Sequence, residues 1–210
     1  MAPTLAVFAK APLAGQVKTR LARTIGDDDA LAVYLALLDR TAQAVSRWTG
    51  DIITFVSGDP LSLSRTALRR HPTRPQTDGG LGARLLSAVN EISAPCVIIG
   101  ADCPSLTAEH LGRLAGALSN APIAFGPAHD GGYWGVAIAD RTCAPIIFSD
   151  DLPWSQPELL TETRARLTRH GVAPALVDTL DDLDDADDLR RAEASGFDWR
   201  SFTAAAWRSA

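Results

Sequence analysis

Short apolar runs alternate along the chain with longer segments in which apolar residues recur every three or four positions. The runs predict buried strands, at Thr4–Ala9, Ile52–Ser57, Cys96–Gly100, Ile123–Phe125, Tyr133–Ala139 and Val172–Val177. The periodic segments predict helices, at Asp27–Trp48, Leu61–Arg70, Leu81–Ile92, Thr107–Leu118, Gln156–His170 and Ala186–Ala194. Strands that alternate with helices favour an α/β protein with three layers, α/β/α, and a mostly parallel sheet.

One connection is too short for this pattern. Only seven residues separate Ile123–Phe125 from Tyr133–Ala139, so we expect an antiparallel strand there, or one outside the sheet. The length of 210 residues favours a single domain over residues 1–196, followed by a tail over residues 197–210. Trp199, Phe202 and Trp207 in this tail fit either a dimer interface or, as we favour, packing on the protein's own core.

Charge is distributed unevenly. The net charge is −5, but seven Asp residues lie between Asp178 and Asp188, and the rest of the chain has a net charge of +2. A nearly neutral body argues against a protein that coats nucleic acid, which would carry a basic stripe. No apolar run reaches the ~20 residues of a membrane span, and the N-terminus lacks the charge order of a secretory signal. The three cysteines form no disulfide framework, so we expect a cytoplasmic protein. From the charge and the short apolar runs we expect neither nucleic-acid nor membrane partners.

A loop predicted over Lys10–Gly26 follows the first strand and is rich in donors. Lys10, Lys18 and Arg20 supply cations, Thr19 a hydroxyl, and Gly15 allows close approach of the backbone. This composition predicts binding of a polyphosphate, although the spacing is not that of a P-loop. The alternative is a solvated basic turn.

The stretch after the third strand, Ile98–Leu106, places Asp102 two residues beyond the strand. Mg²⁺ commonly binds one or two carboxylates together with substrate phosphates and waters, so one Asp facing a phosphate loop is sufficient. The alternative is that Asp102 caps the next helix, for which Thr107 is better placed. We expect Cys103 to be a buried structural thiol, because no His lies beside it.

Two further segments carry candidate chemistry. Asp130, before two glycines, is either a turn residue or a second acidic group near the metal. Tyr133 and Trp134 follow it at the start of a predicted strand, so one of them must face the cleft. The Asp run from Asp178 is expected to be mostly a solvated face and a helix N-terminus, with one carboxylate able to join a metal site.

Together, three motifs resemble the DUF2064 family of bacterial proteins in the glycosyltransferase-A (nucleotide-diphospho-sugar transferase) superfamily. They are Lys10-x-Pro12-x-x-Gly15-x-Val17-Lys18-Thr19-Arg20-Leu21, Gly100-x-Asp102-Cys103-Pro104-x-Leu106 and Asp130-Gly131-Gly132-Tyr133. Similar signals continue at Gly80-Leu81-Gly82-x-Arg84, Leu152-Pro153-Trp154-Ser155 and Asp182-Leu183-Asp184. The first two motifs also resemble those of 2-phospholactate guanylyltransferase and, more distantly, of the molybdenum-cofactor nucleotidyltransferases. Where this superfamily usually has Thr-Pro after the D-x-D element, this chain has Asp185-Ala186.

The resemblance implies a role for each candidate residue. It implies phosphate contacts from Lys10, Gly15, Lys18, Thr19 and Arg20, and a metal-binding carboxylate at Asp102. It also implies base contacts near Gln76 and Gly80, and an acceptor pocket bordered by Asp130, Tyr133 and Trp154.

These observations lead to one function hypothesis and two alternatives. The first is a transferase that depends on Mg²⁺ or Mn²⁺ and uses a nucleotide-activated donor, an NDP-sugar, with Asp102 and Asp130 as catalytic residues. The first alternative is nucleotidyl transfer from an NTP with release of pyrophosphate, as in a guanylyltransferase, and the second is a nucleotide-binding module without turnover. The expected partners are the donor and a small-molecule acceptor, and the expected state is a monomer or homodimer.

Overall fold

The computed structural model describes residues 2–92 and 94–209, so Met1 and Ala210, the ends of the predicted domain and tail, lie outside the described residues. Its sheet has seven strands in the order β3-β2-β1-β4-β6-β5-β7. β6 runs antiparallel to β4 and β5, and the other neighbouring strands are parallel, which confirms the mostly parallel sheet and its antiparallel exception. The strands are β1 Thr4–Lys10, β2 Ile52–Ser57, β3 Thr73–Pro75, β4 Cys96–Gly100, β5 Ile123–Pro127, β6 Tyr133–Ile138 and β7 Ala175–Leu176.

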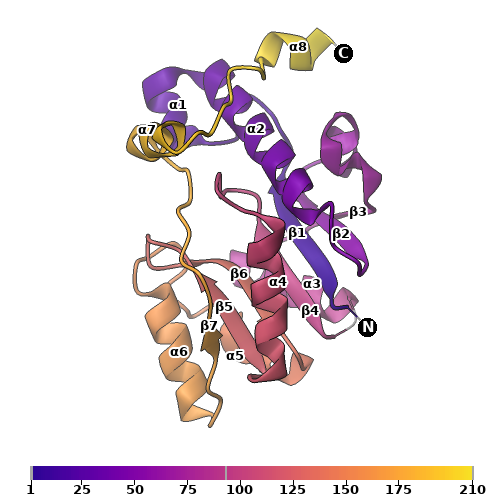
Figure 1. Ribbon diagram of the computed structural model, residues 1–210, viewed down its shortest axis with the longest axis vertical. Coiled ribbons are helices and arrows are strands. Elements are labelled where there is room, and N and C mark those ends of the chain that lie inside the picture. Colours follow the sequence, from indigo (N-terminus) through magenta and orange to yellow (C-terminus); the bar gives the residue numbers. More distant parts are fainter. Residues whose placement is uncertain (1, 93, 210) are drawn as a thin grey trace.

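Helices cover both faces of the sheet, as predicted. In Figure 1, α2 and α4 lie in front of the sheet, and they share one apolar cluster with it. α3, α5 and α6 share a second apolar cluster with the opposite face. The helices are α1 Thr19–Ile25, α2 Asp27–Val45, α3 Leu81–Glu91, α4 Ala108–Gly116, α5 Ala144–Ile147, α6 Leu159–Arg169, α7 Ala186–Ala194 and α8 Ala204–Ser209, with 3₁₀ turns at Pro60–Arg65, Ala67–Arg70, Ala117–Ser119 and Arg141–Cys143.

The alternation of side chains along β1 assigns its residues to the two faces. Leu5, Val7 and Ala9 pack on the side of α2, whereas Ala6 and Phe8 pack on the side of α3. Because successive side chains of a strand point to opposite faces, the next residue, Lys10, belongs to the α3 side. Its register partner Ser57 belongs to that side too, since Phe55, two residues earlier in β2, lies in the α3 cluster.

α2 is buried on two sides rather than along one stripe. Leu31, Leu35 and Leu38 face the sheet, as predicted, but Val33 and Leu37 pack in a third apolar cluster with α1 and α7. α2 therefore lies between the sheet and a small second layer that α1 and α7 form. Periodicity predicted only the sheet-facing stripe, because the second layer is built from distant segments.

Several boundaries differ from the predictions for local reasons. The predicted loop after β1 contains α1, whose apolar residues Leu21 and Ile25 pack in the third cluster. The expected helix Leu61–Arg70 is two 3₁₀ turns, broken at Thr66, which has extended backbone angles. The last strand is only Ala175–Leu176, because Pro174 cannot donate to a ladder. β3 was not predicted.

The chain crosses the sheet edge after β7. In Figure 1 the segment after β7 runs past β5 to α7, which lies beside α1 near the N-terminal part of α2. The backbone of Leu180 bridges to Ala128, and the Leu183 N–H donates to the Asp102 carbonyl at 3.1 Å. Acidic residues from the C-terminal third therefore reach the loop that follows β4.

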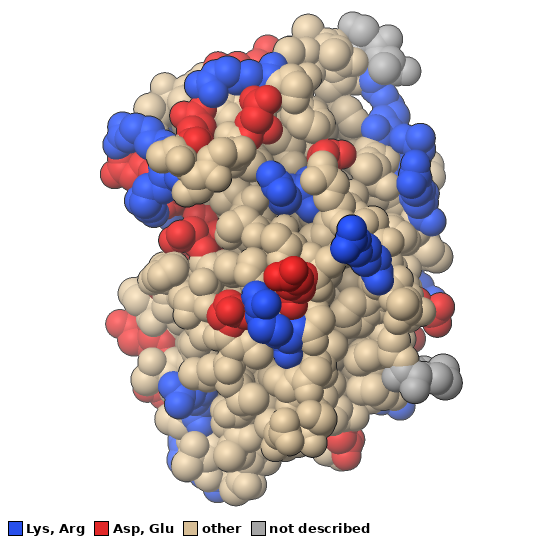
Figure 2. Space-filling view, viewed as in Figure 1, with Lys and Arg blue, Asp and Glu red and all other residues tan. Residues whose placement is uncertain are grey.

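The tail packs on the protein's own core, as we favoured. Phe202 and Trp207 contact the cluster between α2 and the sheet, and the guanidinium of Arg65 lies 4.8 Å from the centre of the Trp207 ring system. None of the helices in the described part of the chain is both long and apolar enough to cross a membrane. On the face drawn in Figure 2, Lys and Arg are interspersed with Asp and Glu rather than forming one basic stripe.

Candidate functional site

A cleft of about 500 Å³ lies at the carboxyl ends of the first parallel strands. The sheet order places its polar residues in a row along this edge. Gln76 follows β3, Ser57 ends β2, Lys10 ends β1, Asp102 follows β4 and Tyr133 begins β6. Ligands of open α/β sheets bind at this edge, so the cleft is the candidate site.

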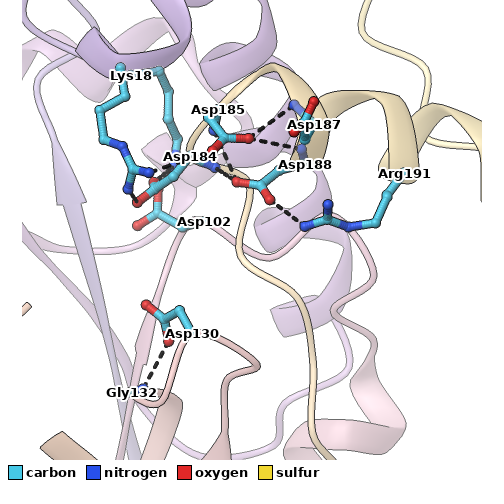
Figure 3. A network of polar contacts seen from close by, with 10 residues as sticks. Lys18, Asp102, Asp130, Gly132, Asp184, Asp185, Asp187, Asp188 and Arg191 are labelled. Atoms are coloured by element: carbon cyan, nitrogen blue, oxygen red, sulfur yellow. Dashed lines mark hydrogen bonds and ion pairs between the residues drawn. The ribbon is translucent and has the colours of Figure 1, made fainter. Parts of the chain in front are cut away.

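Lys18 occupies the β4 side of the cleft. It precedes α1 as its N-cap, with a left-handed backbone (φ 46°) that non-glycine residues rarely adopt. Its side chain is only 5% exposed, and its ammonium donates to Oδ1 of Asp102 and, at 3.3 Å, to Oδ1 of Asp184. Figure 3 shows Lys18 beside both carboxylates. The predicted phosphate loop and the predicted metal carboxylate thus share one cleft.

The charges of this cluster are coupled. Burial lowers the pKa of Lys18, but Asp102 and Asp184 together outweigh burial and raise the pKa above its ordinary value. The ammonium therefore stays protonated at neutral pH. Both carboxylates are about half exposed, 49% and 48%, and so remain accessible to a ligand in the cleft.

The backbone around α7 fixes Asp184 in this position. Asp185 is the N-cap of α7, and its carboxylate accepts the N–H groups of Asp187 and Asp188. Asp188 completes the capping box by accepting the N–H groups of Asp184 and Asp185. Figure 3 shows this network beside Lys18, with Arg191 paired to Asp188. Two of the seven Asp residues, Asp185 and Asp188, therefore cap the helix, and Asp184 alone of the run lines the cleft.

Behind this cluster lies Asp182. Burial, followed by the nearby charges of Asp130, Asp102 and Asp184, raises the pKa of Asp182 to about 7, although Lys18 opposes the shift. The Cys103 thiol donates to Asp182, and burial is the largest cause that raises the pKa of this thiol. Cys103 is therefore a buried neutral thiol, as the sequence predicts.

The opposite, β2 side of the cleft carries Gln76, Ser57 and Arg84. The amide nitrogen of Gln76 donates to the carbonyls of Ala9 and Phe55, which ties together the ends of β1 and β2. The guanidinium of Arg84 donates from Nε to the Gly79 carbonyl at 2.9 Å and from Nη1 to Ser57 Oγ at 3.4 Å. Both side chains are thus held by the fold before any ligand binds.

Aromatic and aliphatic side chains form the end of the cleft near β6. The Tyr133 and Trp154 rings line it, together with apolar residues of the sheet and of α3. Trp154 donates its indole N–H to the Ser149 carbonyl, and the buried Tyr133 hydroxyl has no hydrogen-bond partner among the described residues. These two residues therefore offer apolar surface to a ligand rather than polar atoms.

The structure brings together most of the predicted site residues but not all. Lys10, Lys18, Thr19, Arg20, Gln76, Asp102, Tyr133 and Trp154 line the cleft. Gly15 lies outside this lining and turns the loop with φ 76°, and Gly80 is the N-cap of α3. Asp130 also lies outside the lining, and its carboxylate accepts the Gly132 N–H at 2.8 Å, as a turn residue does. A catalytic role for Asp130 stays a prediction.

Sequence reasoning missed two residues that shape the site. Tyr34 of α2 lines the cleft, and its hydroxyl accepts the Lys10 N–H at 2.7 Å and donates to the Lys10 carbonyl. No sequence signal distinguished Tyr34 from the apolar residues of α2. Arg84 was part of a quoted motif but received no role, and only its orientation from α3 into the cleft gives it one.

The oxygen donors fit a hard divalent cation only in part. Within residues 2–92 and 94–209, no three His, Cys, Asp or Glu side chains are arranged to hold a metal. Asp102 and Asp184 supply two carboxylates, and Mg²⁺ commonly completes its shell with phosphates and waters. The donor set therefore fits Mg²⁺ or Mn²⁺ in the presence of a phosphate ligand.

Comparisons with known proteins agree with this geometry. The sequence pattern of DUF2064, described as an uncharacterized protein conserved in bacteria, matches residues 21–156. No curated protein matches the chain significantly in sequence. Among solved structures, a "putative nucleotide-diphospho-sugar transferase" from Desulfovibrio desulfuricans G20 is 26% identical, with a TM-score of 0.82 over 94% of this chain and 90% of that one.

Two more distant structures show the same fold. The inositol-1-phosphate CTP transferase of T. maritima is 12% identical, with a TM-score of 0.61 over 92% of this chain and 95% of that one. Rv0371C of Mycobacterium tuberculosis H37Rv, in complex with manganese, is 21% identical, with a TM-score of 0.53 over 93% and 100%. The predicted fold of the nucleotide-diphospho-sugar transferases is therefore confirmed, and the similarity supports the predicted class of enzyme, a transferase.

Proposed function

Since the chain belongs to the DUF2064 family, we propose that it is a metal-dependent transferase that uses a nucleotide-activated donor. The observation that carries this proposal is the contact of buried Lys18 with Asp102 and Asp184 at the carboxyl edge of the sheet. A cation and two half-exposed carboxylates in one cleft suit a magnesium-bound diphosphate. The transferase named for the Desulfovibrio protein and the manganese complex of the Mycobacterium protein support the same assignment.

In this proposal the cleft residues hold and neutralise the diphosphate. Asp102 and Asp184 would hold Mg²⁺ or Mn²⁺, which supplies Lewis-acid stabilisation of the phosphate charge. Lys18 and Arg20 donate to phosphate oxygens, and Thr19 adds a hydroxyl donor. These donors are in place before reaction, so they stabilise the charge that develops on the leaving diphosphate. The acceptor lies toward Tyr133 and Trp154, whose rings exclude water from that end.

We propose an NDP-sugar as donor, with attack of the acceptor on the sugar carbon and departure of the NDP. Nucleotidyl transfer uses the same phosphate contacts, but an acceptor phosphate attacks the α-phosphorus of an NTP and pyrophosphate leaves. The CTP transferase among the similar structures favours this second reaction. A cytoplasmic location, a single domain over residues 1–196 and a catalytic role for Asp130 belong to the same proposal.

Product analysis distinguishes the two reactions. The protein is incubated with Mg²⁺, a panel of NTPs or NDP-sugars, and phosphorylated or hydroxylated acceptors. We expect free NDP from an NDP-sugar, and release of pyrophosphate from an NTP would select nucleotidyl transfer instead. If neither product forms and no nucleotide binds in the presence of Mg²⁺, the transferase proposal fails, whereas binding without turnover would leave a nucleotide-binding module.

A further inference from the structure

The cations of the cleft fall into two groups that differ in their partners. Lys10, Lys18, Arg20 and Arg84 line the cleft, against only two acidic residues, Asp102 and Asp184. Lys18 and Arg20 pair with these carboxylates. None of the described carboxylates lies within 4.0 Å of the charged atoms of Lys10 or Arg84, so neither cation of the β2 side forms an ion pair with the described residues.

Arg84 is held in place without being neutralised. Its two hydrogen-bond partners among the described residues, the Gly79 carbonyl and the Ser57 hydroxyl, are neutral acceptors. They orient the guanidinium, whose five N–H donors outnumber the two bonds it makes. Arg74 pairs with Glu91 and Arg166 with Asp151, and both of these arginines lie outside the cleft.

Lys10 belongs to the same side. It ends β1 in register with Ser57, the residue that holds Arg84, and the alternation along both strands directs Lys10 and Ser57 toward α3. Asp102 follows β4, which is two strands away from β2, and neighbouring strands are about 4.8 Å apart. Arg84, which Ser57 of β2 holds, is therefore separate from the Lys18 cluster, and Lys10 at the end of β1 lies between the two along the sheet edge.

We propose that Arg84, with Lys10, is a second anion-binding subsite that takes a phosphate or carboxylate group of a substrate. Arginine in a fixed orientation suits such groups, because its N–H donors match two anion oxygens. The proposal rests on the proposed function, since it assigns part of the same cleft. The anion has two possible sources: the terminal phosphate of an NTP, or a phosphate or carboxylate on the acceptor.

Calorimetric titrations of Arg84→Gln test the subsite and separate the sources. The probes are the NTP, NDP and NMP of one base, and inorganic phosphate added to protein saturated with NDP and Mg²⁺. Loss of a charge-assisted contact predicts roughly 10- to 100-fold weaker binding of one anion. A loss larger for NTP than for NMP identifies the donor's terminal phosphate. A loss confined to inorganic phosphate identifies the acceptor.

Matched variants control for folding. Arg84→Lys keeps the charge and should retain part of the affinity, and Ser57→Ala should cause a smaller loss than Arg84→Gln. Arg74→Gln removes an arginine outside the cleft and should bind every probe like the wild type. Thermal melting of each variant shows that the comparison is made between folded proteins.

Three outcomes overturn the subsite. They are unchanged binding of all probes by Arg84→Gln, an equal loss for NMP and NTP, or no binding of any probe by the wild type. A parallel titration of Asp102→Asn with inorganic pyrophosphate in EDTA keeps the two proposals apart. Binding there that depends on Arg84 but not on Asp102 supports the subsite, even where the metal-dependent function fails.

Discussion

The cations on the two sides of the cleft differ in the partners that hold them. On the β4 side, Lys18 is buried and satisfied by Asp102 and Asp184, so the cations are neutralised within the protein. On the β2 side, Arg84 and Lys10 have no carboxylate partner among the described residues, and neutral groups orient Arg84. A phosphate that binds on the β4 side must therefore replace the carboxylate partners of Lys18. An anion that binds on the β2 side can pair with Arg84 and Lys10 without displacing a carboxylate.

This exchange has a physical consequence for metal binding. Lys18 and a divalent cation would compete for the same two carboxylates, so metal alone must displace an internal cation. A nucleotide offers the displaced ammonium a phosphate. Metal and nucleotide are therefore expected to bind more tightly together than separately, which is a coupling between two ligands.

The largest expected effect is that of Asp102→Asn. The change keeps the shape of the side chain but removes its charge, so we expect at least about a 100-fold loss of Mg²⁺-dependent nucleotide affinity. Calorimetry with and without Mg²⁺ measures this loss. Asp181→Asn, in the acidic segment that contains Asp184 but outside the cleft, is the control. Equal Mg²⁺ dependence in the Asp102→Asn protein would contradict the assignment.

Asp182→Asn removes excess negative charge from behind the β4 side. The raised pKa, about 7 in the folded protein, means that Asp182 binds its proton more tightly when folded. The stability of the wild type should then fall as pH rises from about 4 to about 7, and this loss persists above pH 7. In EDTA at pH 8 the variant should be more stable, on the order of 2 kcal/mol.

Urea denaturation between pH 4 and pH 8 checks this prediction. The wild type should lose stability across that range, and Asp182→Asn should lose less. Parallel pH profiles of the two proteins would show that folding does not raise the pKa of Asp182.

Lys18→Met removes the ammonium that pairs with Asp102 and Asp184. Without the ammonium, Mn²⁺ alone should bind the two carboxylates about 10-fold more tightly, while the nucleotide loses a charge-assisted contact of similar size. Titration of Mn²⁺ by electron paramagnetic resonance measures the first effect, and calorimetry measures the second. If Mn²⁺ affinity falls in Lys18→Met, Lys18 does not occupy the place of the metal.

Arg20→Gln has the smallest expected effect. Arg20 is 64% exposed and contacts Asp184 and Asp185 only at 3.5 Å, so its ion pairs stabilise the fold by about 0.5 kcal/mol or less. We expect a loss of about threefold in nucleotide affinity at low salt, which decreases as salt is added. A large loss that does not depend on salt would assign Arg20 to the centre of the phosphate site.

The sequence predicted those parts of the site that depend on local order. β1, β2 and β4 are short, mostly apolar runs, so their ends, and with them Lys10, Ser57 and Asp102, could be assigned to one edge of a parallel sheet. That Lys18 and Asp102 share a cleft follows from the same rule.

The remaining parts depend on contacts between distant segments. Asp184 reaches Lys18 only because the chain after β7 crosses the sheet edge and the Leu183 N–H bonds the Asp102 carbonyl, 81 positions earlier. The sequence did not indicate which of the seven Asp residues would lie beside Lys18 in the cleft. Arg84 faces the cleft rather than solvent because of the packing of α3, and periodicity does not report which polar residue borders an apolar stripe.

The most direct test is a crystal structure with Mn²⁺ and a bound nucleotide, with the metal located by its anomalous scattering. The account predicts Mn²⁺ at about 2.1 Å from an Asp102 carboxylate oxygen, and Lys18 Nζ moved from Asp102 onto a phosphate oxygen. Mn²⁺ remote from Asp102, or a nucleotide bound while Lys18 keeps both carboxylates, would contradict it.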